Sequence, residues 1–358
     1  MGKCITTHHL AAKKPADEML GETKRPSVWR LTAGRRAFIM SISVIIPVKN
    51  GASTLERCLK SICNQSRKPD EIIVIDSASQ DNSRQIALQF GAKVIDIRPE
   101  EFDHGLTRNL GVQRATSNLV YLTVQDAWID DDSLFQRMAA HFDDPEVMAV
   151  TGHQAVPHEK DKNPVRWYHR YSDYNTEVRQ LTSGVHLKGV SQREQMKLIS
   201  WDNVVAMYRR DALLQLPFVQ TEMSEDWMWS YQALERGWKL LRDSSLVVYH
   251  YHHHTYAYTF NTTYSVNYHF QKFFGFRPEL PPVIKPFIQA VYHLFRNKEL
   301  SLREKIYWSG HNLLAGIGAW SSDFNFLWRM KLSGQKGIEK GYRKYCKKIP
   351  QGRQKGRG

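Results

Sequence analysis

Side chains that carry oxygen atoms follow several short apolar runs of this chain, at the points where the runs end. The runs in question are 44–48, 72–75 and 119–124. Asp76 and Ser77 come directly after the second run, and Gln125 and Asp126 come directly after the third. Carboxylate and amide oxygens can hold a divalent cation and can accept hydrogen bonds from the hydroxyls of a ribose. The chemistry that these residues predict is therefore the binding of a nucleotide.

The elements around these residues predict an α/β fold with a mainly parallel sheet. Unbroken runs of Val and Ile are typical of strands that are buried on both faces, and parallel strands need a crossover helix between them. Four such strands are predicted, at 44–48, 72–75, 93–97 and 119–124. Ser53 and Glu56 have the spacing of a capping box, so a helix is expected to begin there. Ligands bind beyond the carboxyl ends of parallel strands, which is where the polar residues fall.

Asp126 is the leading candidate for a metal ligand, because it closes a strand and its carboxylate should project into the crevice. His250 and His252 follow the apolar strand 246–249 and offer imidazole nitrogens. Successive side chains of a regular strand point to opposite faces, so only one of these two histidines is expected to reach the metal. A polar turn that binds no metal is the alternative for the histidine run.

Glu225 and Asp226 open a predicted helix that continues through Trp229 and Leu234. Acidic residues in the first turn of a helix stabilise it by about 0.3 to 1 kcal/mol, which would explain the pair without a catalytic role. A carboxylate can also act as a general base, because a well-placed base needs only to accept a proton as the new bond forms. The local pattern alone fits both helix stabilisation and a catalytic role for the pair.

Six motifs stand in this chain at 44–50, 76–81, 105–109, 125–127, 225–227 and 250–252. Their order resembles that of the family-2 glycosyltransferases, and the resemblance covers about three fifths of the chain, from residue 41 to residue 256. Within the family, the segments 102–109 and 125–127 are most similar to bacterial rhamnosyltransferases, which use a deoxythymidine diphosphate sugar. The resemblance implies the GT-A fold, a Rossmann-like, mixed and mainly parallel sheet flanked by helices, with a C-terminal helical extension.

The resemblance also implies roles for the acidic residues and the histidines. Asp226, beside Glu225, would be the base that takes the proton of the acceptor hydroxyl, in a direct attack that inverts the anomeric carbon. A divalent cation, Mg²⁺ or Mn²⁺, would lie on Asp126 with His250 or His252 and neutralise the departing diphosphate.

Residues that bind the two substrates follow from the strand ends and from the resemblance. Those for the nucleotide sugar are Pro47, Asn50, Asp76, Ser77, Arg108, Asn109, Gln125 and Asp126. Those for the acceptor are Trp201, Asn203 and Trp227, because indole rings stack well on sugar faces. Core packing is the alternative for the tryptophans, and a surface position is the alternative for Arg108. The family usually has Asp-x-Asp where this chain has Val124 to Asp126, which leaves Gln125 as a hydrogen-bonding partner for ribose or sugar.

The predicted function is that of an inverting glycosyltransferase. It would move rhamnose from a nucleotide diphosphate donor to a growing polysaccharide or a lipid-linked glycan acceptor. Two alternatives stay open: transfer of another sugar, galactose or N-acetylglucosamine, and a catalytically silent GT-A-fold binding protein tethered by basic tails.

The net charge of +14 is confined to the two ends of this 358-residue chain. Residues 1–40 carry eight Lys and Arg against three Asp and Glu, and residues 331–358 carry ten against one. The neutral body between them argues against a nucleic-acid groove, because phosphate tracking needs basic residues along the binding face. An anionic membrane surface is the expected partner of the basic ends. No apolar run reaches the length of about 20 residues that spans a bilayer, and a signal peptide is not evident, so a cytoplasmic, peripheral protein is expected.

The chain is expected to divide into four segments. They are a basic, disordered arm at 1–40, a catalytic domain at 41–260 with a nucleotide-sugar half (41–128) and an acceptor half (129–260), a helical extension at 261–330, and a basic, disordered tail at 331–358. Apolar residues at helical spacing follow Ile284 and Ile306 in the extension. Their faces predict either a packing module or dimer contact, or an interfacial membrane face.

Overall fold

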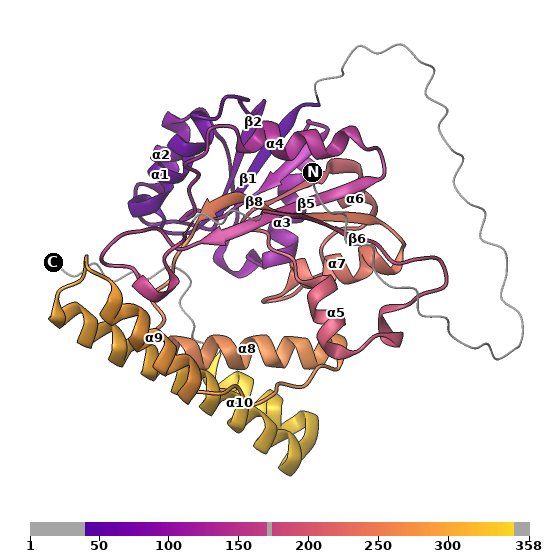
Figure 1. Cartoon of the computed structure of the whole chain (residues 1–358). Coiled ribbons are helices and arrows are strands. Elements are labelled where there is room, and N and C mark those ends of the chain that lie inside the picture. Colours follow the sequence, from indigo (N-terminus) through magenta and orange to yellow (C-terminus); the bar gives the residue numbers. More distant parts are fainter. Residues whose placement is uncertain (1–39, 170–173, 347–358) are drawn as a thin grey trace, which may run out of the picture. The chain divides into compact units, whose positions relative to one another are not determined.

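A single mixed sheet organises the described part of this protein. The structure, a computed structural model, describes residues 40–169 and 174–346. Eight strands lie in the order β3-β2-β1-β4-β7-β5-β8-β6, with helices on both faces (Figure 1). The strands are β1 Ile42–Val48, β2 Glu71–Asp76, β3 Lys93–Asp96, β4 Leu119–Leu122, β5 Val147–Ala155, β6 Thr176–Arg179, β7 Ala206–Arg209 and β8 Lys239–Tyr249. The predicted α/β fold class is confirmed.

Parallel pairing joins the strands that carry the nucleotide-binding motifs. β1 pairs in parallel with β2 and with β4, and β2 pairs in parallel with β3. β7 runs antiparallel to both of its neighbours, β4 and β5. β5 and β8 are again parallel, and β6 closes the sheet antiparallel to β8. The carboxyl ends of β1, β2 and β4 therefore meet at one edge of the sheet.

Ten α-helices are described, together with four short 3₁₀ turns. The helices are α1 Ala52–Cys63, α2 Ser83–Gln89, α3 His104–Arg114, α4 Leu134–Ala140, α5 Gln192–Ile199, α6 Arg210–Gln215, α7 Glu225–Glu235, α8 Tyr256–Phe274, α9 Ile284–Arg296 and α10 Leu302–Tyr345. The turns are Pro99–Glu101, His141–Asp143, Pro164–Arg166 and Leu187–Gly189.

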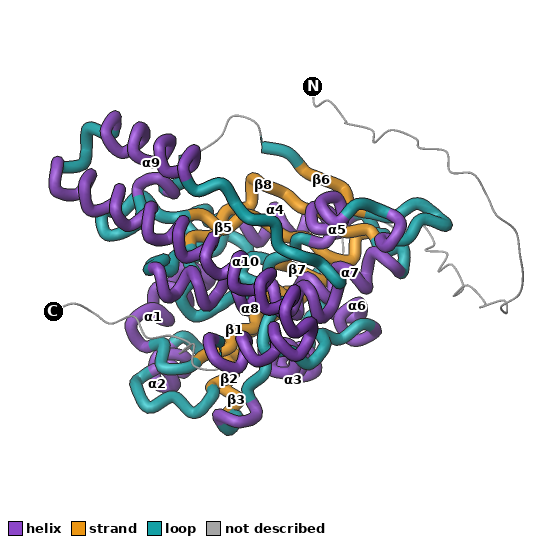
Figure 2. The backbone as a smooth tube through the Cα atoms, turned by 90° about the horizontal axis from the view of Figure 1, so that it is seen from below, coloured by secondary structure: helices purple, strands orange, loops and turns teal. Residues whose placement is uncertain are grey.

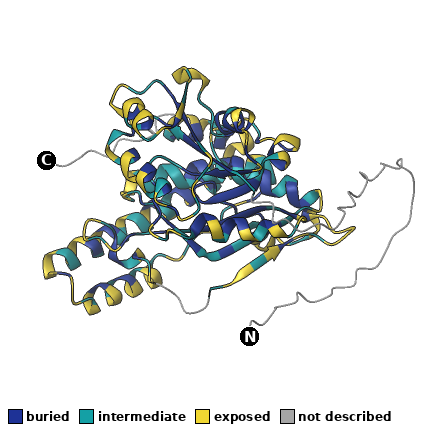
Figure 3. Cartoon of the chain, turned by 90° about the horizontal axis from the view of Figure 1, so that it is seen from above, coloured by how far each residue is buried: buried dark blue, intermediate teal, exposed yellow. Residues whose placement is uncertain are grey.

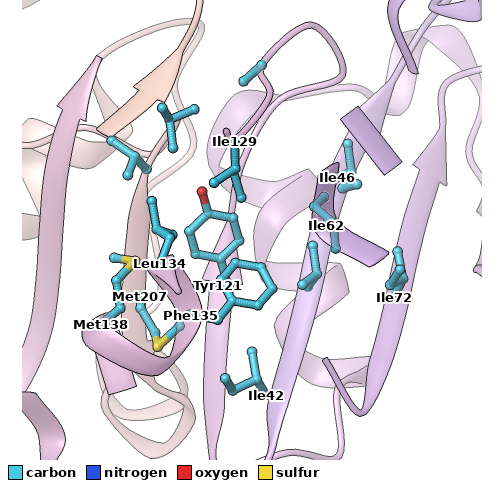
Figure 4. Close-up of a cluster of buried hydrophobic side chains, with 14 of the residues drawn as sticks. Ile42, Ile46, Ile62, Ile72, Tyr121, Ile129, Leu134, Phe135, Met138 and Met207 are labelled. Carbon is cyan, nitrogen blue, oxygen red and sulfur yellow. The ribbon is translucent and has the colours of Figure 1, made fainter. Parts of the chain in front are cut away.

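The sheet is buried on both faces because its central strands send alternate side chains into two separate cores. Ile46 and Tyr121 pack with Phe135 under α1 and α4 (Figure 4). Ile45 and Leu122, from the same two strands, pack on the other face against α3, α6 and α7. Figure 3 shows the buried strands between helices whose outer faces are exposed. Unbroken Val and Ile runs are what such a position requires.

The start of α1 is held by side chains that follow β2, those of Asp81 and Ser83, rather than by its own capping box. α1 begins at Ala52, so Ser53 lies inside the first turn and does not cap the helix. The amide of Ala52 donates to Asp81 Oδ2 (3.0 Å), and the amide of Gly51 donates to Ser83 Oγ (2.7 Å). The capping-box prediction is wrong because the helix begins one residue before Ser53, with Gly51 as its N-cap, and Asp81 and Ser83 accept the amides at this start.

Helices α8, α9 and α10 form a layer next to the sheet domain, below it in Figure 1 and towards the viewer in Figure 2. α10 continues to Tyr345, with a kink at Gly334, where φ is 55°. The expected disordered tail is therefore wrong for residues 331–345, which are helical because Ile338 and Tyr342 pack with Tyr264 of α8. Residues 347–358 and the predicted N-terminal arm lie outside the described residues. Among the helices that are described, none has the length and apolarity to cross a bilayer.

Candidate active site

Asp226 stands in the wall of a pocket at the start of α7. The pocket has a volume of about 300 Å³ and is lined by His104, Met223, Ser224, Glu225, Asp226, Trp227, Val266 and Phe270. The Asp226 carboxylate is half-buried and accepts the amide of Trp227 at Oδ1 (2.8 Å) and the amide of Asn203 at Oδ2 (3.4 Å). The ring of Trp227 packs on Phe270 of α8, with 4.6 Å between ring centroids. Asp226 and Trp227, two predicted site residues, therefore share one concave surface.

Glu225 points away from the solvent and into an ion pair. Its Oε1 lies 3.1 Å from Nη1 of Arg108, and both side chains are at least nine-tenths buried. Asn203 donates to the same oxygen from Nδ2 (3.1 Å). A buried charge pair of this kind is costly to break from one side, since the remaining charge would be left without a partner. The ion pair of Glu225 and Arg108 thus fixes the first turn of α7, which also carries Asp226.

The two neighbouring carboxylates have pKa values that move in opposite directions. Burial raises the pKa of Asp226, and the negative charges of Glu225 and Asp202 raise it further, well above the ordinary value. Burial also favours a raised pKa for Glu225, but the positive charge of Arg108 and the nearby His104 outweigh it, and the pKa of Glu225 is lowered. Two adjacent acids with diverging pKa values are typical of sites where one acid exchanges a proton and the other keeps its charge.

A second polar cluster contains Asp126, His250 and His252. His250 Nε2 lies 3.3 Å from Asp126 Oδ1, and His252 Nε2 lies 4.0 Å from Asp126 Oδ2. One ligand atom from each residue falls within 4.8 Å of the others. A regular strand would let only one of the two histidines reach a metal, but both imidazoles lie near Asp126, because β8 ends at Tyr249 and the alternation of the strand ends with it.

Hydrogen bonds orient the His250 ring towards Asp126. Gln154 Nε2 donates to Asp202 Oδ2 (2.6 Å), so Gln154 Oε1 is turned towards His250 Nδ1 at 2.9 Å. An amide oxygen only accepts, so Nδ1 carries the proton in neutral His250 and Nε2 presents its lone pair. That lone pair then faces a carboxylate oxygen of Asp126. Two facing acceptors are stabilised by a proton or a cation between them. Although burial favours a raised pKa for Asp126, the hydrogen bond from His250 is one cause of its lowered pKa. Carboxylate and imidazole groups are also a suitable ligand set for a divalent metal.

Asp202 and Asn203 connect the two clusters. Asp202 holds Gln154, and through it His250, while Asn203 contacts both Glu225 and Asp226. The sequence predicted Asn203 as a site residue and placed Asp202 in the same segment without a role of its own, whereas Gln154 was not predicted. Asp202 lies between two residues that were selected, which was a usable signal. Gln154 gave no such signal, since it is one polar residue near the end of β5.

Asn50, Asp76 and Ser77, three of the residues predicted to bind the nucleotide sugar, lie in or next to the loops that follow β1 and β2. Ser79 N donates to Asp76 Oδ1 (3.3 Å), and Gln80 N donates to Asn50 Oδ1 (2.8 Å). Ser77 is fully buried, and its Oγ has no hydrogen-bond partner within the described residues. A buried hydroxyl of this kind is one that a ligand could satisfy. Pro47 lies in β1 beside these loops, with the register partner Ile75 on β2.

Backbone strain occurs in the same places. Among the described residues, the non-glycine residues with positive φ are Asn50 (48°), Ala78 (54°) and Ser224 (68°). The first two lie in the loops after β1 and β2, and Ser224 comes directly before Glu225. Strained backbone of this type is often found at functional sites, because the surrounding structure must hold it in place.

Three residues that were predicted to contact a substrate form hydrogen bonds within the protein instead. Gln125 accepts the amide of Lys49 at Oε1 (2.8 Å) and donates to the Lys49 carbonyl (3.2 Å), so it fixes the loop after β1. Asn109 makes the equivalent pair of bonds with the backbone of Phe218. Trp201 is buried in the core, where its Nε1 donates to Tyr208 Oη (2.7 Å) and a sugar cannot reach it.

Residues 43–213 match the protein family described as Glycosyl transferase family 2. The O-antigen chain rhamnosyltransferase RfbN of Salmonella typhimurium is 31% identical over 220 residues, which cover 60% of this chain and 68% of that protein. This chain belongs to glycosyltransferase family 2. The O-antigen chain rhamnosyltransferase WbaN of Salmonella anatum is also 31% identical over 220 residues, covering 60% of this glycosyltransferase and 67% of the relative.

A solved structure supports the fold of this glycosyltransferase. The mannosyltransferase PcManGT from Pyrobaculum calidifontis, in complex with GDP-Man and Mn²⁺, is similar with a TM-score of 0.50. The likeness covers 86% of this chain and 88% of that one, at 16% sequence identity. The family and the GT-A fold that the sequence predicted are confirmed.

Proposed function

We propose that this glycosyltransferase transfers rhamnose, with inversion, from a deoxythymidine diphosphate donor to a growing polysaccharide or lipid-linked glycan. The observation that carries the proposal is the position of Asp226. Its carboxylate borders a pocket, has a raised pKa, and is joined through Asn203 and Asp202 to the Asp126 cluster. The two rhamnosyltransferase relatives support the choice of sugar.

Asp226 acts in this proposal as the general base. The oxygen of an acceptor hydroxyl attacks the anomeric carbon while the bond from that carbon to the diphosphate oxygen breaks. The hydroxyl proton passes to the Asp226 carboxylate, and the nucleotide diphosphate leaves with the electrons of the broken bond. A raised pKa suits a base that works near neutral pH, because a general base is most effective when its pKa lies near the working pH.

Glu225 and Arg108 position this base rather than contact the sugar. The Arg108 guanidinium fixes the Glu225 carboxylate beneath Asp226, and the Glu225 charge then contributes to the raised pKa of Asp226. The backbone strain at Ser224 lies at the same turn. Of the two acids that line the pocket, Glu225 is held in the ion pair with Arg108, which leaves the Asp226 carboxylate to accept the proton.

Asp126, His250 and His252 would hold a divalent cation, which would neutralise the charge that develops on the leaving diphosphate. The donor set favours Mn²⁺ over Mg²⁺, since Mg²⁺ prefers oxygen ligands and two of the three groups here are imidazoles. Asp76, Ser77 and the loop from Pro47 to Asn50 would bind the base and ribose at the adjoining strand ends. Trp227 would pack against the acceptor within the Asp226 pocket. A lipid-linked acceptor would place the enzyme at an anionic membrane surface.

The deciding experiment measures nucleotide binding by calorimetry, with deoxythymidine, uridine and guanosine diphosphates and with or without Mn²⁺. The expected result is a metal-dependent preference for the deoxythymidine form. Donor turnover is then followed for the wild type, for Asp226→Asn and for Asp211→Asn, an exposed acid in the first turn of α6 that serves as the matched control.

Loss of turnover in Asp226→Asn but not in Asp211→Asn supports the proposal. Failure of all three nucleotides to bind rejects it in favour of a silent binding protein. Equal turnover by both variants rejects Asp226 as the general base. A preference for the uridine or guanosine form rejects the choice of sugar.

A further inference from the structure

Helices α9 and α10 form an antiparallel hairpin that packs on α8. The Lys305 ammonium donates to the carbonyl of Phe295 (3.3 Å), and a Cβ placed on Gly316 would lie 3.6 Å from Val283. The end of α9 therefore lies beside the start of α10, and its beginning lies beside the middle of α10. Figure 2 views this hairpin from its outer side.

One side of α10 is packed, and the opposite side is apolar but exposed. The packed side contains Trp308, Gly318, Ser322 and Phe326. The opposite side carries a row that we call the apolar stripe: Ile306, Leu314, Ile317, Trp320, Phe324 and Trp328. Each of these side chains is between 37% and 61% exposed. At 100° per residue, the six positions fall within one third of the helix circumference.

The apolar stripe is also free of exposed charge. Asp323 is the only Asp, Glu, Lys or Arg between Lys305 and Arg329. It is buried and accepts a hydrogen bond from Asn267 of α8. This segment of 23 residues corresponds to about 35 Å of helix. α9 adds exposed apolar side chains of its own, at Ile284, Ile288 and Phe295. An exposed apolar surface of this extent marks an interaction site.

Basic residues border the stripe at both ends. From residue 284 to residue 346 there are eleven Lys and Arg against four Asp and Glu. Lys331 follows the last aromatic residue of the stripe, Lys336 and Lys340 come after the kink at Gly334, and all three are exposed. This excess is complementary to anionic lipid headgroups, whereas a second copy of the chain would bring the same positive charges together.

We propose that the apolar stripe of α10, with its basic borders, is the surface by which this protein lies on an anionic lipid bilayer. The aromatic side chains would sit at the boundary between headgroups and acyl chains, where tryptophan is favoured. The helix lies on the membrane and does not span it, in keeping with the helices of the described ranges. This inference deepens the proposed function, because it rests on a lipid-linked acceptor reached from the membrane surface.

The test is sedimentation of the full chain with vesicles, without donor or acceptor. The vesicles contain phosphatidylethanolamine with phosphatidylglycerol, or phosphatidylcholine alone. A triple variant, Ile306→Ser, Phe324→Ser and Trp328→Ser, is compared with a matched triple variant at exposed apolar residues elsewhere, Leu88→Ser, Val178→Ser and Leu214→Ser. A third variant carries Lys331→Gln, Lys336→Gln and Lys340→Gln.

The wild type is expected to bind the anionic vesicles and to lose binding as salt is added. The stripe variant should bind at least tenfold more weakly, the matched variant should bind like the wild type, and the lysine variant should lose affinity for anionic vesicles only. Equal binding by the stripe and matched variants overturns the proposal, as does a wild type that binds no vesicles. A lipid-free dimer in light scattering that becomes monomeric in the stripe variant also overturns it, in favour of a second copy.

Binding of deoxythymidine diphosphate is measured on the same variants, so that a failure of the membrane surface can be distinguished from a failure of the proposed function. If the nucleotide binds and vesicles do not, only the membrane surface is rejected. If vesicles bind and no nucleotide does, only the proposed function is rejected.

Discussion

The pKa of the Asp226 carboxyl is set by three neighbours that each penalise its negative charge: the buried surroundings, Glu225 and Asp202. Arg108 does the opposite for Glu225. Such an arrangement costs folding stability, since a charged group is held where it is poorly solvated. The cost is understandable at a site where one carboxylate must take up a proton and return it.

Replacing Asp226 by Asn should lower the rate of transfer by about 10²- to 10⁴-fold, the usual contribution of a general base. The same change should stabilise the fold. The pKa of Asp226 is raised in the folded protein, so the stability it contributes is present at low pH and is lost as pH rises through the folded value. Thermal unfolding should therefore show a gain over the wild type that grows from acidic to neutral pH. A loss of activity with a lower melting temperature would instead indicate misfolding.

The acidic limb of the pH–rate profile should move when the neighbours of Asp226 are neutralised. Burial raises the pKa of Asp226 most, followed by Glu225 and then Asp202. Glu225→Gln removes a negative charge, so ionisation of Asp226 becomes easier and the limb of kcat/KM should shift to lower pH. Asp202→Asn should shift it in the same direction by less. An unchanged limb in both variants would mean that Asp226 does not control the rate.

Asp126→Ala should abolish the dependence of donor binding on Mn²⁺, because the carboxylate is the anionic ligand of its cluster. Gln154→Leu should weaken Mn²⁺ binding by about 10- to 100-fold, since residues that orient a ligand have effects of this size. Calorimetry with Mn²⁺ in the presence of the nucleotide measures both. Asp211→Asn is the control, and wild-type affinity in Asp126→Ala would contradict the assignment of the metal site.

At the scale of elements, the position of the proposed base depends on how α3 is fixed to the segment before α7. Asn109 of α3 makes two hydrogen bonds to the backbone of Phe218, and Gly105 lies against the next residue, Val219. Arg108 of the same helix reaches Glu225. A single helix therefore supports both the segment that leads to the first turn of α7 and the ion pair of that turn.

Gly105→Ala should destabilise the fold by about 1 to 3 kcal/mol, because overpacking forces the backbone to move. A Cβ at this position would lie 2.1 Å from the Val219 carbonyl oxygen, which cannot turn aside as a flexible side chain would. Gly189→Ala is the matched control, since nothing lies within 4 Å of the added atom there. Denaturant unfolding measures both changes, and equal midpoints would show that α3 is not closely fixed to this segment.

For the whole molecule, the C-terminal helices share a core with the body. Trp308 of α10 packs with Leu294 of α9, with Leu300 between the helices, and with Trp167 from the loop after β5. Tyr264 and Phe326 join α8 to α10 in a second cluster. The hairpin that we assign to the membrane is therefore part of the same packed unit as the candidate active site.

Trp308→Ala should cost about 3 to 5 kcal/mol of unfolding free energy, the usual loss for a buried tryptophan. Trp320→Ala removes the same side chain from the opposite face of α10, where it is 37% exposed, and should cost much less. Circular dichroism during denaturant unfolding compares the two. Equal losses would mean that the two faces of α10 do not differ in packing.

Local pattern alone determined the sheet motifs and the family of this protein. Val and Ile runs predicted β1, β2 and β4, because a strand buried on both faces must be apolar throughout. Short motifs selected Asp126 and Asp226, since neighbouring residues specify a strand end or the first turn of a helix. These signals are carried by residues close together in the chain.

Tertiary structure alone decided which side chains meet. Arg108 and Glu225 are 117 residues apart, and Gln154 and His250 are 96 apart, so no local periodicity could pair them. The same holds for the second histidine beside Asp126, which depends on where β8 ends. Contacts of this kind arise only when the sheet and its covering helices bring distant segments together, because side-chain pairing depends on position in space rather than on spacing along the chain.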